Sequence, residues 1–219
     1  LNAFNHPLKT LWMQEITFVV KGLNMVIDWF EELSSTHQYL VDGLRNGTLC
    51  APYAVGVNRQ SQGVGSRGNK WIGEEGNLFF SFCVEEKHLS SDLPLASISI
   101  YFSALTKEIL EERGSQVWLK WPNDFYLKDQ KIGGIITTKI GSCIVGSIGL
   151  NLCFAPPEFG TLDIKIGARE LSFLLLEAIE RKITWKKVFS KYKLEFYKNA
   201  SFSCHINGKR VSLGDAVLN

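Results

Sequence analysis

The most restrictive feature of the sequence is residues 120–135, Lys-Trp-Pro-Asn-Asp-Phe-Tyr-Leu-Lys-Asp-Gln-Lys-Ile-Gly-Gly-Ile. An apolar run of β type, residues 116–119, leads into a Pro-Asn-Asp turn, and the alternation after the turn predicts a hairpin. Pro122 fixes its own φ and favours an extended conformation for the residue before it. The turn therefore holds Asn123 and Asp124 at a strand end, where side chains can reach a ligand.

The predicted hairpin joins residues 125–127 to residues 131–137. It would bring the ammonium groups of Lys120 and Lys131 close to the carboxylate of Asp124. Placing two ammonium groups beside one carboxylate is unfavourable in a hairpin that has no ligand. The same arrangement would suit the binding of an anion. A solvated turn is the common alternative for any isolated Pro-Asn-Asp sequence.

Composition indicates a packed globular chain with no strong charge bias. Of 219 residues, 45% are hydrophobic and 21% charged, and the formal net charge is +2, so DNA is not an expected partner. The five cysteines are scattered, without a Cys-x-x-Cys pair, which favours reduced thiols over a zinc site. The apolar runs are too short for a membrane span and no signal peptide is recognisable. We therefore expect a cytoplasmic protein.

The order of predicted elements indicates an α+β fold. The predicted strands are residues 26–30, 54–57, 78–84 and 143–152, besides those of the hairpin. The predicted helices are residues 34–47, 92–114, 168–183 and 185–199. We expect one mixed sheet covered by helices on one face, with glycine-rich loops at its other, ligand-facing side.

The clearest predicted helix is residues 92–114, which Asp92 should cap, Pro94 should open and Gly114 should end. Its apolar stripe recurs every three or four residues and should face the core: Leu95, Ile98, Phe102, Leu105 and Ile109.

A glycine-rich segment, residues 60–71, contains Gly-x-Gly-x-x-Gly from Gly63 onward. A dinucleotide site would need a helix directly afterwards, but residues 71–77 predict turns and then a strand follows. A dinucleotide fold is therefore rejected, and the chain has no P-loop sequence. The loop can still wrap an anion with its backbone N–H groups, helped by Arg67 and Lys70.

Four polar residues stand out within predicted elements. Ser35 and Gln38 have the spacing of a helix capping box, so capping alone is the simplest role for Ser35. His37 is interpreted as a surface residue. Asn151 is the polar exception at the end of the apolar strand 143–152.

The chain is expected to divide into three parts. Residues 1–24 form an N-terminal extension of uncertain status, in which residues 16–20 have β character. Residues 25–199 form the main domain. Residues 200–219 change to short alternating strands around the Asn207-Gly208 turn signal, too short for an independent core.

Lys120-Trp-Pro-Asn-Asp, followed by Lys131-Ile-Gly-Gly-Ile, resembles the signature of biotin–protein ligases. The other landmarks of that family stand in its order, from the Ser-Thr helix start through Gln60 and the glycine loop to Gly149-Leu-Asn. The resemblance runs from about residue 26 to residue 219. It implies the monofunctional type without a DNA-binding domain, a fold like that of class II aminoacyl-tRNA synthetases, and a catalytic domain over residues 25–199. Residues 200–219 resemble the start of the small SH3-like C-terminal domain, cut short.

The resemblance implies ATP-dependent attachment of biotin to a lysine of a carrier protein through biotinyl-5′-AMP, with Mg²⁺ accompanying the ATP. The usual family partner is the biotin carboxyl carrier domain of acetyl-CoA carboxylase, and a homodimer is compatible with the family. A lipoate–protein ligase shares the fold but has different motifs. A non-catalytic biotin-sensing module is the other alternative, and the presence of Lys131 argues against it.

The resemblance also assigns residues. Implied biotin-binding residues are Ser35, Thr36, Gln60, Gly63, Val64, Lys131 and Gly134. Implied nucleotide-binding residues are Ser66, Arg67, Lys70, Trp71, Asn123, Lys131, Leu150 and Asn151, with Trp71 stacking on adenine and Asn151 bonding its edge. Implied catalytic residues are Lys131, Asp124, Asn123 and Arg67, and Asp124 is a candidate Mg²⁺ ligand.

The chain departs from the family in the glycine loop. Val64, Ser66 and Asn69 stand where relatives carry arginines. Losing a charged contact to phosphate predicts weaker retention of biotinyl-5′-AMP, by roughly ten- to a hundred-fold.

Overall fold

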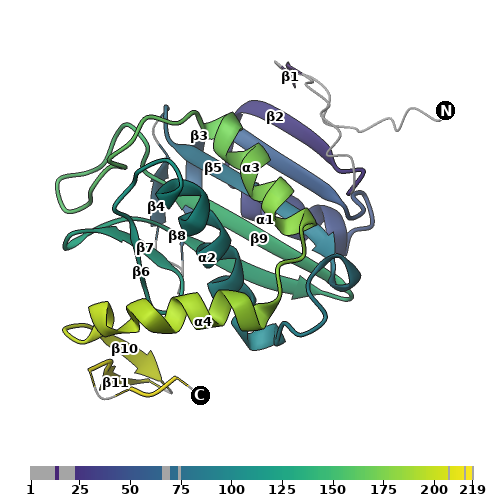
Figure 1. Ribbon diagram of the computed structural model, residues 1–219. Coiled ribbons are helices and arrows are strands. Elements are labelled where there is room, and N and C mark those ends of the chain that lie inside the picture. The colour runs from purple at the N-terminus through teal and green to yellow at the C-terminus, as the bar shows by residue number, and fades with distance from the viewer. Residues whose placement is uncertain are drawn as a thin grey trace.

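A computed structural model describes residues 13–14, 23–65, 70–73, 75–206, 208–214 and 216–218. At its centre is a nine-stranded mixed sheet (Figure 1). Its strands are β1 (Met13–Gln14), β2 (Val26–Leu33), β3 (Tyr53–Val64), β4 (Lys70–Gly73), β5 (Leu78–Glu85), β6 (Trp118–Lys120), β7 (Asp124–Leu127), β8 (Gln130–Ile140) and β9 (Cys143–Leu150). The order across the sheet is β1-β2-β3-β5-β9-β8-β7-β6, with β4 paired to β3 beside this path. The predicted α+β class is confirmed.

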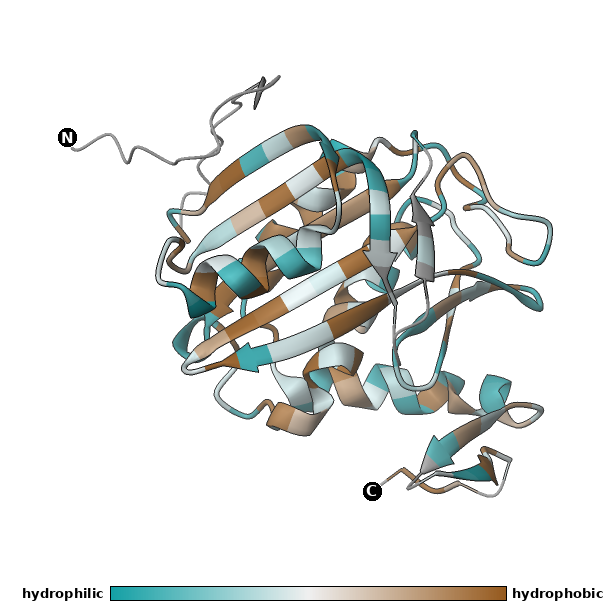
Figure 2. Cartoon of the chain, turned by 180° about the vertical axis from the view of Figure 1, so that it is seen from behind, coloured by the Kyte–Doolittle hydropathy of each residue, from teal (hydrophilic) through white to brown (hydrophobic). Residues whose placement is uncertain are grey.

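One helix, α1 (Thr36–Arg45), makes the only parallel connection among the described strands. Parallel neighbours need a crossover, and α1 provides it between β2 and β3. Leu40 of α1 is fully buried against Val55, Cys83 and Val145 of the sheet. Figure 2 shows this face, with α1 in front of strands whose hydrophobic and hydrophilic residues alternate.

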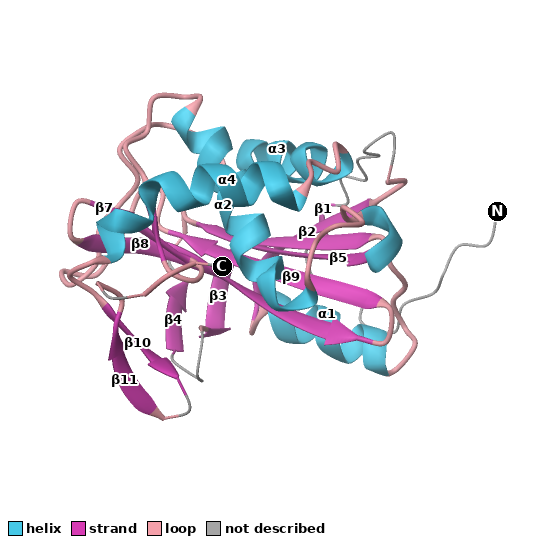
Figure 3. Ribbon diagram, turned by 60° about the horizontal axis from the view of Figure 1, so that its bottom comes forward, coloured by secondary structure: helices cyan, strands magenta, loops and turns pink. Residues whose placement is uncertain are grey.

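Three helices cover the opposite face of the sheet, as Figure 3 shows. They are α2 (Ile98–Glu111), α3 (Ala168–Glu180) and α4 (Trp185–Glu195). Between them and the sheet lies the larger core, which contains Phe80 and Phe82 of β5 and Phe102 of α2. The sequence predicted that the helices cover one face of the sheet, and α2, α3 and α4 confirm this. Among the described helices, α1 alone lies on the opposite, ligand-facing side.

The start of α2 differs from the prediction. The α-helix begins at Ile98, after a 3₁₀ turn at Leu95–Ser97, and Leu95 is 52% exposed instead of buried. Asp92 does not cap α2. Its carboxylate accepts hydrogen bonds from the backbone N–H groups of Trp185 and Lys186 at 2.8 and 3.0 Å, so it caps α4, which lies next to it in space and 93 residues away in sequence.

The C-terminal residues form the predicted hairpin, β10 (Ser203–Ile206) with β11 (Lys209–Ser212). Just before it, Phe202 packs against Trp118 and Tyr126 with ring centroids 5.4 and 5.5 Å apart. The hairpin thus extends from the β6–β7 end of the sheet.

Part of the predicted N-terminal extension belongs to the core. Leu23 is 4% exposed within the larger hydrophobic cluster, and β1 pairs with β2. Residues 16–20, predicted as a strand, lie outside the described residues. In the described part of the chain, no helix has the length and apolar character required to cross a membrane.

Candidate active site

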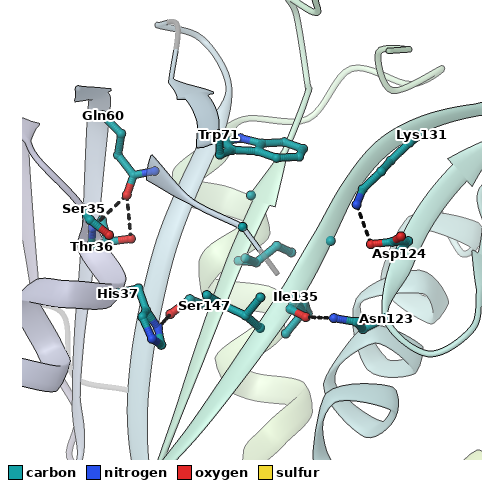
Figure 4. Close-up of a pocket in the computed structure, with 15 residues that line it drawn as sticks. Ser35, Thr36, His37, Gln60, Trp71, Asn123, Asp124, Lys131, Ile135 and Ser147 are labelled. Carbon is teal, nitrogen blue, oxygen red and sulfur yellow. Dashed lines mark hydrogen bonds and ion pairs between the residues drawn. The ribbon is translucent and has the colours of Figure 1, made fainter. Parts of the chain in front are cut away.

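A cavity of about 50 Å³ opens on the α1 side of the sheet (Figure 4). It is smaller than an ordinary ligand pocket of roughly 300–1,000 Å³. It is lined by Ser35, Thr36, His37, Gln60, Gly65, Trp71, Asn123, Asp124, Lys131, Gly134, Ile135, Ile136, Ser147, Ile148 and Gly149. Eight predicted site residues therefore meet here: Ser35, Thr36, Gln60, Trp71, Asn123, Asp124, Lys131 and Gly134.

One side of the cavity is formed by the start of α1 and by Gln60 of β3. Gln60 Oε1 accepts from the Thr36 backbone N–H at 2.8 Å and from the Thr36 hydroxyl at 3.1 Å. Ser35 caps α1, because its hydroxyl accepts from the Gln38 backbone N–H at 3.3 Å. The Gln38 side chain donates to Asp42 instead, so the capping box is only half formed.

The other side carries the charged pair of the predicted hairpin. Lys131 Nζ lies 2.6 Å from Asp124 Oδ1, and the side chains are 25% and 21% exposed. Both are still accessible, so an entering anion can contact the ammonium. The Asn123 amide donates to the Ile135 carbonyl and thereby ties the turn to β8.

Two glycines of β8 permit this close packing. A Cβ on Gly134 would lie 3.0 Å from Asp124 Oδ1, and one on Gly133 would lie 2.5 Å from the Gly149 carbonyl oxygen. Side chains at these positions would displace the Asp124 carboxylate or push β8 away from β9. Gly133 is therefore required by the pairing of β8 with β9, and Gly134 leaves room for the Asp124 carboxylate.

Trp71 lies over the cavity between its two sides (Figure 4). A Cβ on Gly149 would be 3.0 Å from Trp71 Nε1, so the indole rests directly against this strand position and would have to shift if a side chain were added there. Its buried Nε1 has no hydrogen-bond partner among the described residues. Residues 71–77 were predicted to form turns. Residues 71–73 belong instead to strand β4, which pairs with β3, whereas residues 75–77 form a turn as predicted.

The sequence did not identify four polar residues around the cavity. His37 Nδ1 lies 2.8 Å from the Ser147 hydroxyl, and its Nε2 lies 3.3 Å from Thr138 Oγ1. Ser147 is also 2.8 Å from the buried Ser81 hydroxyl. The interpretation of His37 as a surface residue was wrong. Burial, with a smaller contribution from Arg45, lowers the pKa of His37 below its ordinary value.

Some predicted residues lie away from the cavity lining. Lys120 does not join the charged pair, because its ammonium sits over the rings of Tyr126 and Phe202, 5.6 and 5.3 Å from their centroids. Leu150 is fully buried in the larger core. Asn151 is 3% exposed and donates to the Gly160 carbonyl at 3.1 Å, so it holds the loop after β9.

The glycine loop is only partly described. Gly63 is buried, and a Cβ there would lie 2.9 Å from Gln60 Nε2. Val64 and Lys70 are paired backbone positions of β3 and β4. Ser66 and Arg67 lie outside the described residues, and their roles stay predictions.

A second cavity, about 300 Å³, lies between α2 and α4. It is larger, but none of the predicted site residues that the structure describes lines it, so the chemistry of the lining residues, and not the cavity volume, identifies the site. Among the described residues no group of three or more His, Cys, Asp or Glu side chains could hold a metal ion.

The comparisons with known proteins agree with this geometry. A model of the Biotin/lipoate A/B protein ligase family matches residues 29–154. The bifunctional ligase/repressor BirA of Escherichia coli (strain K12) is 37% identical over 160 residues, which are 69% of this chain and 48% of the relative.

Two solved structures share the fold. The biotin acetyl coenzyme A carboxylase synthetase of Helicobacter pylori, crystallised with biotinylated ATP, has a TM-score of 0.83 and 42% identity, covering 88% of this chain and 92% of that one. The biotin protein ligase of Leishmania major in complex with biotinyl-5-AMP has a TM-score of 0.70 and 21% identity, covering 84% and 87%.

The sheet and the length of the match show the α+β fold that these ligase structures share. The chain belongs to the biotin/lipoate A/B protein ligase family. The matched region spans about half the length of the Escherichia coli relative.

Proposed function

We propose that this chain is a biotin–protein ligase, which uses ATP to attach biotin to a lysine of a biotin carboxyl carrier domain. One observation carries this proposal: a single cavity has the Lys131–Asp124 ion pair on one side and polar groups on the other. The polar groups are the amide of Gln60 and the hydroxyls of Ser35 and Thr36. A polar ring would bind at the hydroxyl end, and a carboxylate would lie towards the ammonium. The Helicobacter pylori neighbour is named a biotin acetyl coenzyme A carboxylase synthetase and was crystallised with biotinylated ATP, which supports the same substrate.

In the first step, a carboxylate oxygen of biotin would attack the α-phosphorus of ATP. The bond to the β-phosphate bridging oxygen would break, giving biotinyl-5′-AMP and pyrophosphate. Two anions must approach each other, so a preorganised cation has its greatest effect in this transition state. Lys131 would supply it, and Asp124 would hold the ammonium in place before the substrates enter.

In the second step, the neutral amine of the carrier lysine would attack the acyl carbon of the mixed anhydride. The acyl C–O bond would break, AMP would leave with the electron pair, and the amine would lose a proton. Trp71 would keep the adenine in place by stacking, and Asn123 and Asp124 lie where they could position phosphate or the incoming lysine.

Mg²⁺ would arrive with ATP as part of the substrate. It usually keeps several waters and binds through one or two carboxylates and the phosphates, so no all-protein cage is needed. Among the described residues, Asp124 is the one carboxylate that lines the cavity, and it fits this limited role if the phosphates displace it from Lys131.

The partner and the location follow from the proposed activity. A carrier domain with an exposed lysine would dock at the cavity, and DNA is not needed for either step. We place the protein in the cytoplasm, where ATP and carboxylases meet, and a homodimer remains compatible with this function.

Incubation with ATP, biotin and a carrier domain tests the function directly. Intact-mass spectrometry should show one biotinyl group on the carrier, with release of AMP and pyrophosphate. A carrier whose acceptor lysine is replaced by arginine should stay unmodified, as should the sample without ATP. Replacing biotin by lipoic acid is the matched control. If lipoic acid is attached and biotin is not, the chain is a lipoate ligase; if biotin binds but neither is attached, it is a sensing module.

A further inference from the structure

A chain of hydrogen-bonding groups runs beneath the hydroxyl end of the cavity. It begins at Thr138 Oγ1, 3.3 Å from His37 Nε2, and continues from His37 Nδ1 to the Ser147 hydroxyl at 2.8 Å. The Ser147 and Ser81 hydroxyls are 2.8 Å apart. We call this the hydroxyl chain, and it joins the helix α1 to strands β5, β8 and β9.

The hydroxyl chain ends at Gln60. The Ser81 hydroxyl lies 2.8 Å from Thr36 Oγ1, which lies 3.1 Å from Gln60 Oε1. The Thr36 backbone N–H also donates to Gln60 Oε1, at 2.8 Å. Because a backbone N–H can only donate, the oxygen of the Gln60 amide must face Thr36, and its NH₂ group points away from Thr36 (Figure 4).

Counting protons fixes the direction of the chain. Four contacts join His37 to Gln60 Oε1, and each needs one proton. The amide oxygen has none to give, and the three hydroxyls of Ser147, Ser81 and Thr36 supply one each. The fourth proton must therefore come from His37 Nδ1. In the other neutral tautomer the imidazole proton is on Nε2, and only three protons serve the four contacts. One contact would then join two acceptors with no proton between them.

The direction of the chain decides what the cavity offers a ligand. Each hydroxyl proton is used along the chain, so Ser147 and Thr36, which both line the cavity, present only lone pairs to a ligand. The Gln60 NH₂ group and the Ser35 hydroxyl supply donors. This combination matches a cyclic urea, whose N–H groups need acceptors and whose carbonyl needs donors.

We propose that His37 is a positioning residue whose Nδ1–H fixes the direction of the Ser147, Ser81 and Thr36 hydroxyls. Ser147 and Thr36 then present only acceptors to the cavity, which selects ligands that present N–H groups. The proposal rests on the proposed function, because it explains how this end of the cavity recognises the urea ring of biotin. His37 acts through the hydroxyls and takes no part in bond making or breaking.

The tautomer can be observed directly and without a ligand. The chain has four histidines, so uniformly ¹⁵N-labelled protein gives few imidazole signals, and loss of one set in His37→Asn assigns it. Long-range ¹H–¹⁵N correlation spectra should show a proton on Nδ1 and a bare Nε2. A proton on Nε2 alone would overturn the proposal whatever the protein binds.

Two isosteric variants separate positioning from mere packing. Asparagine places its amide nitrogen near the position of Nδ1 and can still donate to Ser147, whereas glutamine reaches the position of Nε2. His37→Asn should therefore keep biotin affinity within about twofold, and His37→Gln should weaken it by about five- to tenfold, the effect of one lost hydrogen bond. Calorimetric titration of variants checked by thermal unfolding measures both. Equal affinities in the two folded variants would contradict the proposal.

A ligand change tests the selectivity itself. In the cyclic carbonate analogue of biotin, ring oxygens replace the N–H groups. The wild type should prefer biotin strongly, and the preference should shrink about fivefold or more in His37→Gln while the KM for ATP stays unchanged. An unchanged preference in His37→Gln would overturn this inference alone. Absence of any biotin binding by the wild type would instead refute the proposed function, and the tautomer would still be tested by the spectra.

Discussion

Lys131 is the residue on which the proposed chemistry depends most. Its ammonium is held by Asp124 at 2.6 Å on the cavity, where negative charge would develop. Lys131→Ala should leave biotin binding nearly intact and slow pyrophosphate release by about 10²–10³-fold, the usual effect of removing one preorganised donor. Lys120→Ala is the matched control, because that ammonium lies over two aromatic rings outside the cavity. A Lys131→Ala rate within threefold of wild type would refute the assignment.

Trp71 is expected to form the platform for adenine. Trp71→Ala should weaken ATP or adenylate binding by roughly 1–3 kcal/mol, the scale of base stacking, and Trp71→Phe should recover part of the loss. Because the indole also rests on Gly149, thermal unfolding without ligands must be measured in parallel. A large loss of stability with unchanged nucleotide affinity would mean that Trp71 is only a packing residue.

At the scale of single residues, the sequence predicted one ion pair within a local motif, wrongly added Lys120 to it, and missed contacts that depend on distant neighbours. Asp124 and Lys131 are close in sequence, and their pairing was expected. His37 meets Ser147 across 110 residues, and no local pattern places two such positions together. A weak signal existed, because Ser147 is a polar residue inside an apolar strand run, on the same face as Gly149.

At the scale of elements, the turn between β6 and β7 is tied to the short 3₁₀ helix, Phe196–Asn199, that follows α4. Asn199, 1% exposed, accepts from the Trp121 backbone N–H at 2.7 Å and donates to the Leu119 carbonyl at 3.3 Å. These bonds support the strand that leads into Asn123 and Asp124.

Replacing Asn199 should therefore loosen this turn. Asn199→Ala leaves buried backbone groups unpaired and should lower the free energy of unfolding by about 1–3 kcal/mol for each unsatisfied group. Asn199→Asp keeps the acceptor for Trp121 and is the matched control, although it places a charge in a buried position. Chemical denaturation measures the free energy of unfolding. The rate of pyrophosphate release shows whether the turn still positions Asn123 and Asp124 for the reaction. If Asn199→Ala unfolds like wild type, the contact is not structural.

Elements with long apolar or periodic patterns were predicted correctly, and so was the short β10–β11 hairpin, from its turn signal. The helices α2, α3 and α4 and the strands β5 and β9 have enough residues for a pattern to decide them. The four-residue strand β4 exists because β3 pairs with it, which sequence alone does not show. Asp92 caps α4 and not α2. The start of α4 is close to Asp92 in space but far from it in sequence, so a local sequence pattern does not reveal the contact.

At the scale of the whole molecule, two histidines make stability depend on pH. Burial lowers the pKa of His37 and of His88 below the ordinary value of 6.5. Between that value and the lower folded pKa, the unfolded chain binds more protons than the folded chain. The stability these residues contribute is therefore complete above about pH 6.5 and is lost as pH falls through the folded pKa.

Urea denaturation at about pH 7.5 and about pH 5.5 should show this loss, with a slope for His37 of at most about 1.4 kcal/mol per pH unit. His37→Asn and His88→Asn should each flatten the dependence, because asparagine does not titrate, and the double variant should flatten it most. His88 is not part of the cavity lining, so His88→Asn separates the general effect of burial from the effect of the site. A dependence that both single variants leave unchanged would mean that carboxylates, and not these imidazoles, control the stability below neutral pH.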